Sequence, residues 1–209
     1  MTAAACGGGQ IQNLQLHWQD ADMKVAPSPT VAQAFANVPI TFGIRDTRPD
    51  PTVVGKYEDD GFVVRTTDNV AQYCSNRFGD MLRGAGARLT EAPQAILAAD
   101  LVEYRVDEGS KFAGVVRIRM TVRRAGQPDW SKDYEGTSNR WGKTHNPDNF
   151  NEALSNALAE ATTNILHDEE FGHALMYGGS PAPTPMPGAP MGPAPAPMAP
   201  PTAAPSAGR

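Results

Sequence analysis

The stretch FAGVVRIRMTVRR, residues 112–124, decides the fold of this chain. Val116, Ile118 and Met120 fall on one face of an extended backbone, and Arg117 and Arg119 fall on the other. This two-residue alternation predicts a long strand with one buried face and one solvated face. The hydrophobic core of the protein must therefore form against the apolar face of this strand.

Alternating runs on both sides of this stretch predict further strands of the same sheet. We expect them at residues 38–46, 94–106 and 130–141, with a short hairpin that joins 53–55 to 62–64, and a short strand within residues 11–18. If 130–141 returns beside the central strand, Glu135 and Asp133 lie opposite Arg117 and Arg119. Such cross-strand pairs contribute about a few tenths of a kcal/mol each.

Two segments carry apolar residues at the three- and four-residue steps of an amphipathic helix. The first is capped by Thr67 or Asp68 and ends at Gly84. The second begins with Asn146 as a cap and Pro147 in its first turn, and its alanine-rich stripe suggests a close approach to the sheet. The sequence therefore predicts a two-layer α+β domain. We expect an antiparallel or mixed sheet of about four to six strands, with both helices on one face.

Composition divides the chain into three parts: residues 1–10 with a glycine spacer, a single domain over 11–176, and a Pro/Ala-rich tail over 177–209. The tail holds most of the nineteen prolines and has no charge before Arg209. This composition predicts an extended, polyproline-like segment. The tail is either a spacer or, through the spacing of Pro187 and Pro190, a segment that docks on aromatic grooves.

The residues that carry chemistry form no recognisable catalytic arrangement. The chain has none of the motifs of serine hydrolases, phosphate loops, dinucleotide loops or zinc proteases. His167 and His173 flank three acids, but their spacing puts them on different helix faces and Gly172 interrupts the segment. Cys74 lies on an apolar helix stripe, as a buried structural thiol does. We therefore expect no enzymatic activity, no cofactor and no metal.

Two groups of charged residues are candidates for a partner surface. The first is the row of Arg117, Arg119 and Arg123, which alternatively forms a salt-bridged solvent face. The second is Asp46 with Arg48 in a proline-rich turn, where the alternative is local pairing and capping of backbone amides. The net charge is −5 and the arginines are scattered among acids, so nucleic acid is not an expected partner.

Ala3-Ala4-Ala5-Cys6 resembles the end of a bacterial lipoprotein signal, in which Cys6 becomes the lipidated first residue. No basic start and apolar run fit between Met1 and Cys6, so a signal peptide would be encoded upstream of Met1. The alternative is a chance cysteine in an unstructured N-terminus.

Together with Asp46-Thr47-Arg48 after the first clear strand and the arginine-bearing central strand, this tract resembles the YajG-type family of Gram-negative envelope lipoproteins. The resemblance spans about residues 40–166. It implies a lipid anchor at Cys6 and an outer-membrane location that faces the periplasm. It also implies a non-catalytic module that binds an envelope protein, in the service of transport or assembly. The alternative is a soluble scaffold whose proline-rich tail docks on partner domains.

Overall fold

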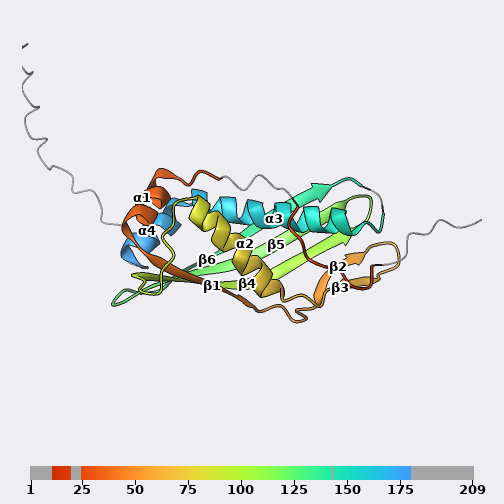
Figure 1. The fold of residues 1–209 in the computed structure, drawn as a ribbon, viewed down its shortest axis with the longest axis horizontal. Helices are drawn as coiled ribbons and strands as arrows, with labels where there is room; N and C mark the ends of the chain where they lie inside the picture. The colour runs from red at the N-terminus through yellow and green to blue at the C-terminus, as the bar shows by residue number, and fades with distance from the viewer. Residues whose placement is uncertain (1–10, 20–24, 143, 180–209) are drawn as a thin grey trace, which may run out of the picture.

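The computed structural model describes residues 11–19, 25–142 and 144–179, and Figure 1 shows how the helices and strands of these residues are arranged. The strands are β1 (Ile40–Asp46), β2 (Val53–Tyr57), β3 (Val63–Arg65), β4 (Ala95–Glu108), β5 (Phe112–Arg124) and β6 (Trp130–Arg140). The helices are α1 (Pro29–Asn37), α2 (Val70–Gly84), α3 (Pro147–His167) and α4 (Glu169–Tyr177).

The sheet is mixed and is organised around β4. Strand β5 pairs antiparallel with one edge of β4, and β6 pairs antiparallel with β5. The other edge of β4 is shared, since β1 runs parallel to it as far as Leu101 and β2 runs parallel to it from Val106. Strand β3 completes the short hairpin with β2. Helices α2 and α3 lie over one face of the sheet (Figure 1), so the expected two-layer α+β domain is confirmed.

Strand β5 has the two faces that its alternation predicts. Val116, Ile118 and Met120 are fully buried beneath the helices. Arg117 and Arg119 keep about half of their side-chain surface exposed on the opposite face, with 43% and 56% respectively. The core therefore forms on one side of the sheet, and the other side has no helix over it in the part of the chain that the structure describes (Figure 1).

Helix α3 approaches the sheet so closely that two strand positions admit only glycine. A Cβ atom at Gly136 would lie 2.1 Å from the carbonyl oxygen of Ala157, and one at Gly114 would lie 2.6 Å from that of Ala153. Both contacts fall on the alanine-rich stripe of α3, and Ala153, Ala157 and Ala161 are fully buried. The close approach that this stripe suggests is confirmed.

The expected strand within residues 11–18 is wrong, because this segment forms no ladder with the sheet: it makes a backbone hydrogen bond to the end of β3, from Leu14 N–H to the carbonyl oxygen of Arg65 at 2.7 Å, but no strand. It crosses the helical side as an extended strap, with Leu14 fully buried. Other N–H groups of the strap bond to side chains of α3: His17 N–H donates to Asn151 Oδ1 at 3.1 Å, and Gln19 N–H donates to Ser155 Oγ at 3.2 Å. Alternation of side chains alone cannot distinguish such a strap from a strand.

Of the two predicted helix caps, one is observed and the other is displaced along the chain. Asn146 Oδ1 accepts from Asp148 N–H at 3.0 Å, so the predicted start of α3 is confirmed. Helix α2 is capped by Asn69 rather than by Thr67 or Asp68. Asp68 instead accepts from the N–H of Leu16, in the strap, at 2.7 Å.

Helices α1 and α4 are not expected from the sequence, and they pack against each other at one end of the domain (Figure 1). Pro29 stands in the first turn of α1 behind a Ser28 cap, so it begins a helix rather than breaking the chain. Gly172 lies inside α4 instead of ending the segment. A Cβ at this position would lie 2.9 Å from Val31 N, so glycine permits the close contact of α4 with α1. No helix among the described residues is both long and apolar enough to cross a membrane.

We expect Gly136→Ala to lower the free energy of unfolding by about 3 kcal/mol, because the added methyl group overlaps the backbone of α3. The matched control is Gly43→Ala, where an added Cβ meets nothing within 4 Å. The control should leave stability unchanged or raise it by up to about 1 kcal/mol. Urea unfolding of the two variants measures the difference, and equal stabilities would contradict the close packing of α3 on β6.

Candidate functional site

The arginines of β5 pair across the sheet with acids of β6 and of the turn before it. Arg117 lies opposite Glu135 and Arg119 lies opposite Asp133, as the alternation of the two strands predicts. Arg119 Nε donates to Asp133 Oδ1 at 2.7 Å and its Nη2 donates to Oδ2 at 3.0 Å, which is a bidentate pair. Hydrogen bonds from Arg119 hold the pKa of Asp133 below its ordinary value. The carboxylate therefore stays ionised and paired at neutral pH.

The pairing continues across β4 to β1. Glu103 accepts from Arg105 Nε at 2.6 Å and lies 3.3 Å from Arg117 Nη1, so one carboxylate links two strands. At the edge of the sheet, Arg45 Nη2 lies 2.8 Å from Asp100 Oδ1. We name this surface the ion-pair face. Its members are Arg45, Asp100, Glu103, Arg105, Asp107, Arg117, Arg119, Arg123, Asp129, Asp133 and Glu135.

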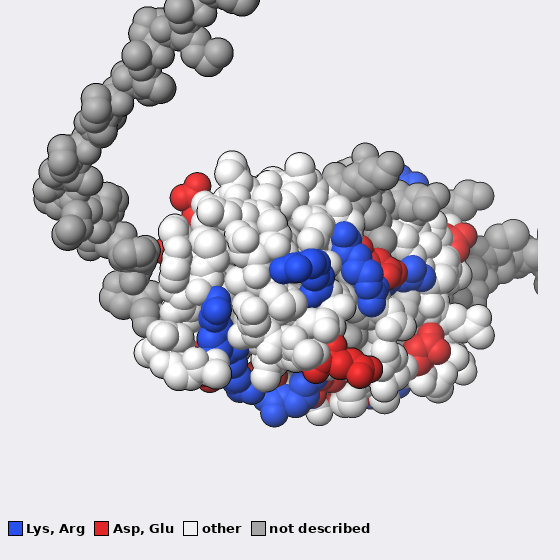
Figure 2. All heavy atoms as spheres, turned by 60° about the vertical axis from the view of Figure 1, so that its left-hand side comes forward, with Lys and Arg blue, Asp and Glu red and all other residues white. Residues whose placement is uncertain are grey.

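Opposite charges lie next to each other over the ion-pair face, and this limits the partners that it fits. Every one of its arginines has an acidic partner within 4 Å. On the side of the domain seen in Figure 2, basic and acidic side chains likewise lie together rather than in large areas of one sign. A polyanion needs an extended area of unpaired positive charge. The arrangement suits a protein surface with its own alternating charges.

A β-bulge in β4 gives the ion-pair face an apolar centre. Pairing with β5 shifts between Leu101 and Glu103, which leaves Val102 outside the ladder and 38% exposed. A shallow cavity of about 250 Å³ lies beside Val102, lined also by Val53 and Tyr104. Sequence reasoning missed this feature, although the buried positions of β4 change from odd to even numbers between Leu101 and Tyr104. That change of phase is the sequence signal of the bulge.

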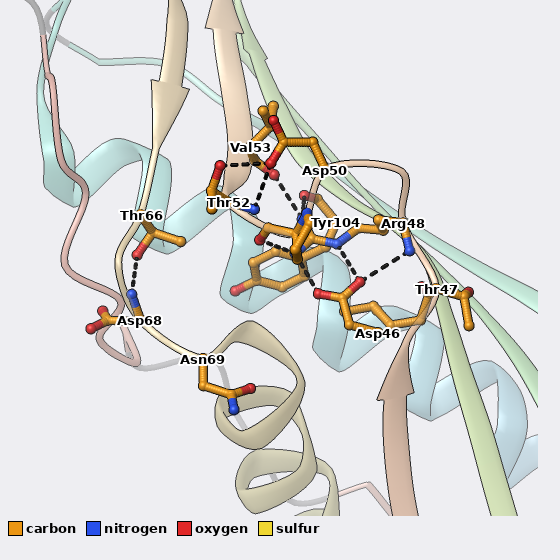
Figure 3. A network of polar contacts seen from close by, with 12 residues as sticks. Asp46, Thr47, Arg48, Asp50, Thr52, Val53, Thr66, Asp68, Asn69 and Tyr104 are labelled. Carbon is orange, nitrogen blue, oxygen red and sulfur yellow. Dashed lines mark hydrogen bonds and ion pairs between the residues drawn. The ribbon is translucent and has the colours of Figure 1, made fainter.

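The second candidate, the turn with Asp46 and Arg48, is a structural network (Figure 3). The Arg48 side chain is only 5% exposed and all five guanidinium donors are used. Two of them go to the carboxylate of Asp46, at 2.9 and 2.7 Å. The other three go to the carbonyl oxygens of Pro51, Val53 and Tyr104, at 2.6, 2.7 and 3.1 Å.

Arg48 therefore has no donor left for a partner, and the interpretation of this turn as a binding loop is replaced by a structural one. The network lies where β1 has ended and β2 has not yet begun. Thr47 N–H donates to the carbonyl oxygen of Leu101 at 3.0 Å, and Arg48 supplies the bond to that of Tyr104. The Arg48 side chain and the turn backbone thus donate hydrogen bonds to carbonyl groups of β4 where no strand pairs with that edge.

The remaining candidates hold no clustered chemistry. Cys74 is fully buried, and burial raises the pKa of its thiol. His167 Nε2 lies 3.0 Å from the carbonyl oxygen of Ala26, and Asp168 caps α4. Among the described residues, no three His, Cys, Asp or Glu side chains gather so that they could hold a metal ion. Cys6 lies outside the described residues, as does the tail from residue 180 onward.

Comparison with known proteins shows the fold but no family. No protein-family model and no curated protein matches the chain. Protein XCC0632 from Xanthomonas campestris, of family model DUF330, is 12% identical with a TM-score of 0.56, over 78% of this chain and 95% of that chain. An uncharacterized protein is 15% identical with a TM-score of 0.49, over 61% of this chain and 90% of that chain.

A lipoprotein also stands among the solved structures that resemble this chain. Lipoprotein GNA1162 from Neisseria meningitidis is 12% identical with a TM-score of 0.26, over 48% of this chain and 81% of that chain. The likeness to the Xanthomonas protein shows a shared fold. The YajG-type resemblance stays a prediction, because no family model matches.

We expect Arg48→Met to destabilise the domain by about 3 kcal/mol, because it leaves Asp46 and three carbonyl groups without their donor. Arg45→Met is the control, since Arg45 is 75% exposed and pairs with Asp100 at the surface. Its loss should cost less than about 1 kcal/mol. Chemical unfolding of both variants tests this, and a mild effect at Arg48 would reopen the turn as a binding loop.

Proposed function

We propose that this chain is a non-catalytic, lipid-anchored lipoprotein of the cell envelope. A lipid on Cys6 holds it at the outer membrane, facing the periplasm, and the ion-pair face binds another envelope protein. The observation that carries the anchor is the small-residue tract that ends at Cys6, followed by Gly7-Gly8-Gly9 and then by Ile11, where the chain is fixed to the domain. The structural likeness to proteins that include a lipoprotein agrees with this reading.

The proposed binding surface is the helix-free side of the sheet. Helices bury the other side, whereas this side leaves Val102 and Ile96 exposed among paired charges, at 38% and 45%. Apolar residues inside a polar rim are typical of the centre of a protein interface. The carboxylates and guanidinium groups around them are held in place by their own pairs, so they present a fixed pattern of charge to a partner.

Mass spectrometry of the N-terminus tests the anchor, with the protein expressed from its complete gene in its native cell. We expect a diacylated or triacylated Cys6 as the first residue, in the outer-membrane fraction. The control variant Cys6→Ser should lose both the lipid and the membrane association. A mature protein that begins at Met1 or Thr2 in the cytosol would contradict the anchor.

A charge swap tests the binding surface. Arg119→Glu alone faces Asp133 with a like charge, and it should abolish capture of the envelope partner with a modest loss of stability. The double variant Arg119→Asp with Asp133→Arg keeps an ion pair in the reverse sense. It should recover the melting temperature without recovering the partner in cross-linking of intact cells. If the double variant restores both, the pair serves stability alone.

A further inference from the structure

One end of the sheet is marked by a row of paired residues that crosses four strands. Tyr57 of β2 pairs with Glu108 of β4, Glu108 with Phe112 of β5, and Phe112 with Arg140 of β6. Trp141 follows Arg140 directly in the chain. We call this end, defined by Tyr57, Glu108, Phe112, Arg140 and Trp141, the anchor pole.

The N-terminal strap begins at the anchor pole. The N–H of Ile11 donates to the hydroxyl of Tyr57 at 2.9 Å. Cys6 precedes Ile11 by five residues, and five residues span at most about 18 Å. Since neighbouring strands lie about 4.8 Å apart, the row from Tyr57 to Arg140 is about 14 Å wide. A lipid on Cys6 therefore holds the membrane within about one sheet width of this end.

Trp141 is the large apolar side chain that the anchor pole presents to its surroundings. It is 69% exposed, more than any other exposed large hydrophobic residue among those described. Tryptophan prefers the boundary between lipid headgroups and acyl chains, where its ring is buried and its N–H stays near water. Once the chain is anchored, the membrane interface lies close enough to bury the exposed ring of a tryptophan at this end.

The charges near Trp141 are of both signs, so they do not favour binding to an acidic membrane. Lys56 and Lys111 are exposed at this end, and so are Glu58 and Asp59 of the β2–β3 turn. A mixture of signs gives no polybasic attraction to anionic lipid. Contact with the membrane then depends on the tether and on Trp141, and it extends to neutral phospholipid.

We propose that the anchor pole is the membrane-facing end of the domain and that Trp141 lies in the lipid headgroup region. This rests on the proposed lipid attachment at Cys6. The other end is different, since the chain leaves α4 beside the β5–β6 turn, where Gly179 N–H donates to the carbonyl oxygen of Pro128 at 2.7 Å. Tyr177, 41% exposed near that end, supplies a matched attachment point for a control.

Chemical tethering tests the proposal with the full chain. A maleimide lipid in phosphatidylcholine vesicles couples to Cys6, and Cys74 is fully buried and does not compete. Vesicles that also carry phosphatidylcholine with a TEMPO nitroxide on its headgroup quench tryptophans at the headgroup level. We expect quenching of about a third of the emission, because Trp141 is one of three tryptophans. Trp141→Phe should remove this loss, and high salt should not.

The control carries Cys6→Ser and Tyr177→Cys, so that the same lipid holds the opposite end. In this protein Trp141→Phe should leave the extent of quenching unchanged. Equal quenching with and without Trp141 in the Cys6-tethered protein would overturn the proposal, as would its loss at high salt. Because the tether is attached in vitro, this failure is distinct from an unlipidated Cys6 in cells, which only the N-terminal mass spectrum detects.

Discussion

The architecture depends on Arg48, which bridges the gap that two short strands leave along one long strand. Strand β1 stops pairing at Leu101 and β2 starts at Val106, so no strand pairs with this edge of β4 at Tyr104. Arg48 takes the carbonyl of Tyr104 and, on the other side, those of Pro51 and Val53. Asp46 fixes the guanidinium and neutralises its charge, which a buried cation requires. One side chain thereby joins the two halves of the sheet edge.

The packing of α3 on the sheet depends on a different constraint, which is the presence of glycine at two strand positions. Gly114 and Gly136 let the alanines of α3 reach the backbone of β5 and β6. This proximity brings polar groups of α3 to the outer edge of β6, where Asn164 donates to the carbonyl oxygen of Glu135 at 2.9 Å. The helix therefore packs on the sheet and also satisfies part of its open edge, which limits pairing with other chains there.

Local patterns predicted much of this fold, and the failures have a common cause. The faces of β5, the pairing of Arg119 with Asp133 and the start of α3 follow from residues close in sequence, or from one hairpin. The strap over residues 11–19 alternates as a strand does, but its N–H groups donate to Asn151 and Ser155, which lie far along the chain and which alternation does not reveal. The parallel pairing of β1 with β4 is likewise a long-range choice that periodicity does not encode.

The candidate site divides in the same way. Alternation placed the arginines of β5 on the solvated face, but it could not show that Arg48 is buried, because that depends on carbonyl groups of three other segments. The bulge at Val102 was visible as a change of phase in β4, yet its meaning required the partner strand. The sequence therefore predicts on which face of a regular strand a charged residue lies, but it does not predict whether a charged residue in a turn is buried.

The strap begins at one end of the sheet and α4 ends at the other, so the folded domain fixes the distance between these two points. Strand β5 has 13 residues, so it spans about 43 Å from one end of the sheet to the other. The chain enters at one of these ends and leaves for its proline-rich tail at the other. A hydrogen-bonded sheet keeps that separation without the loss of entropy that stretching a flexible linker would require. The folded domain thus sets the distance between its first attachment point and the start of the tail.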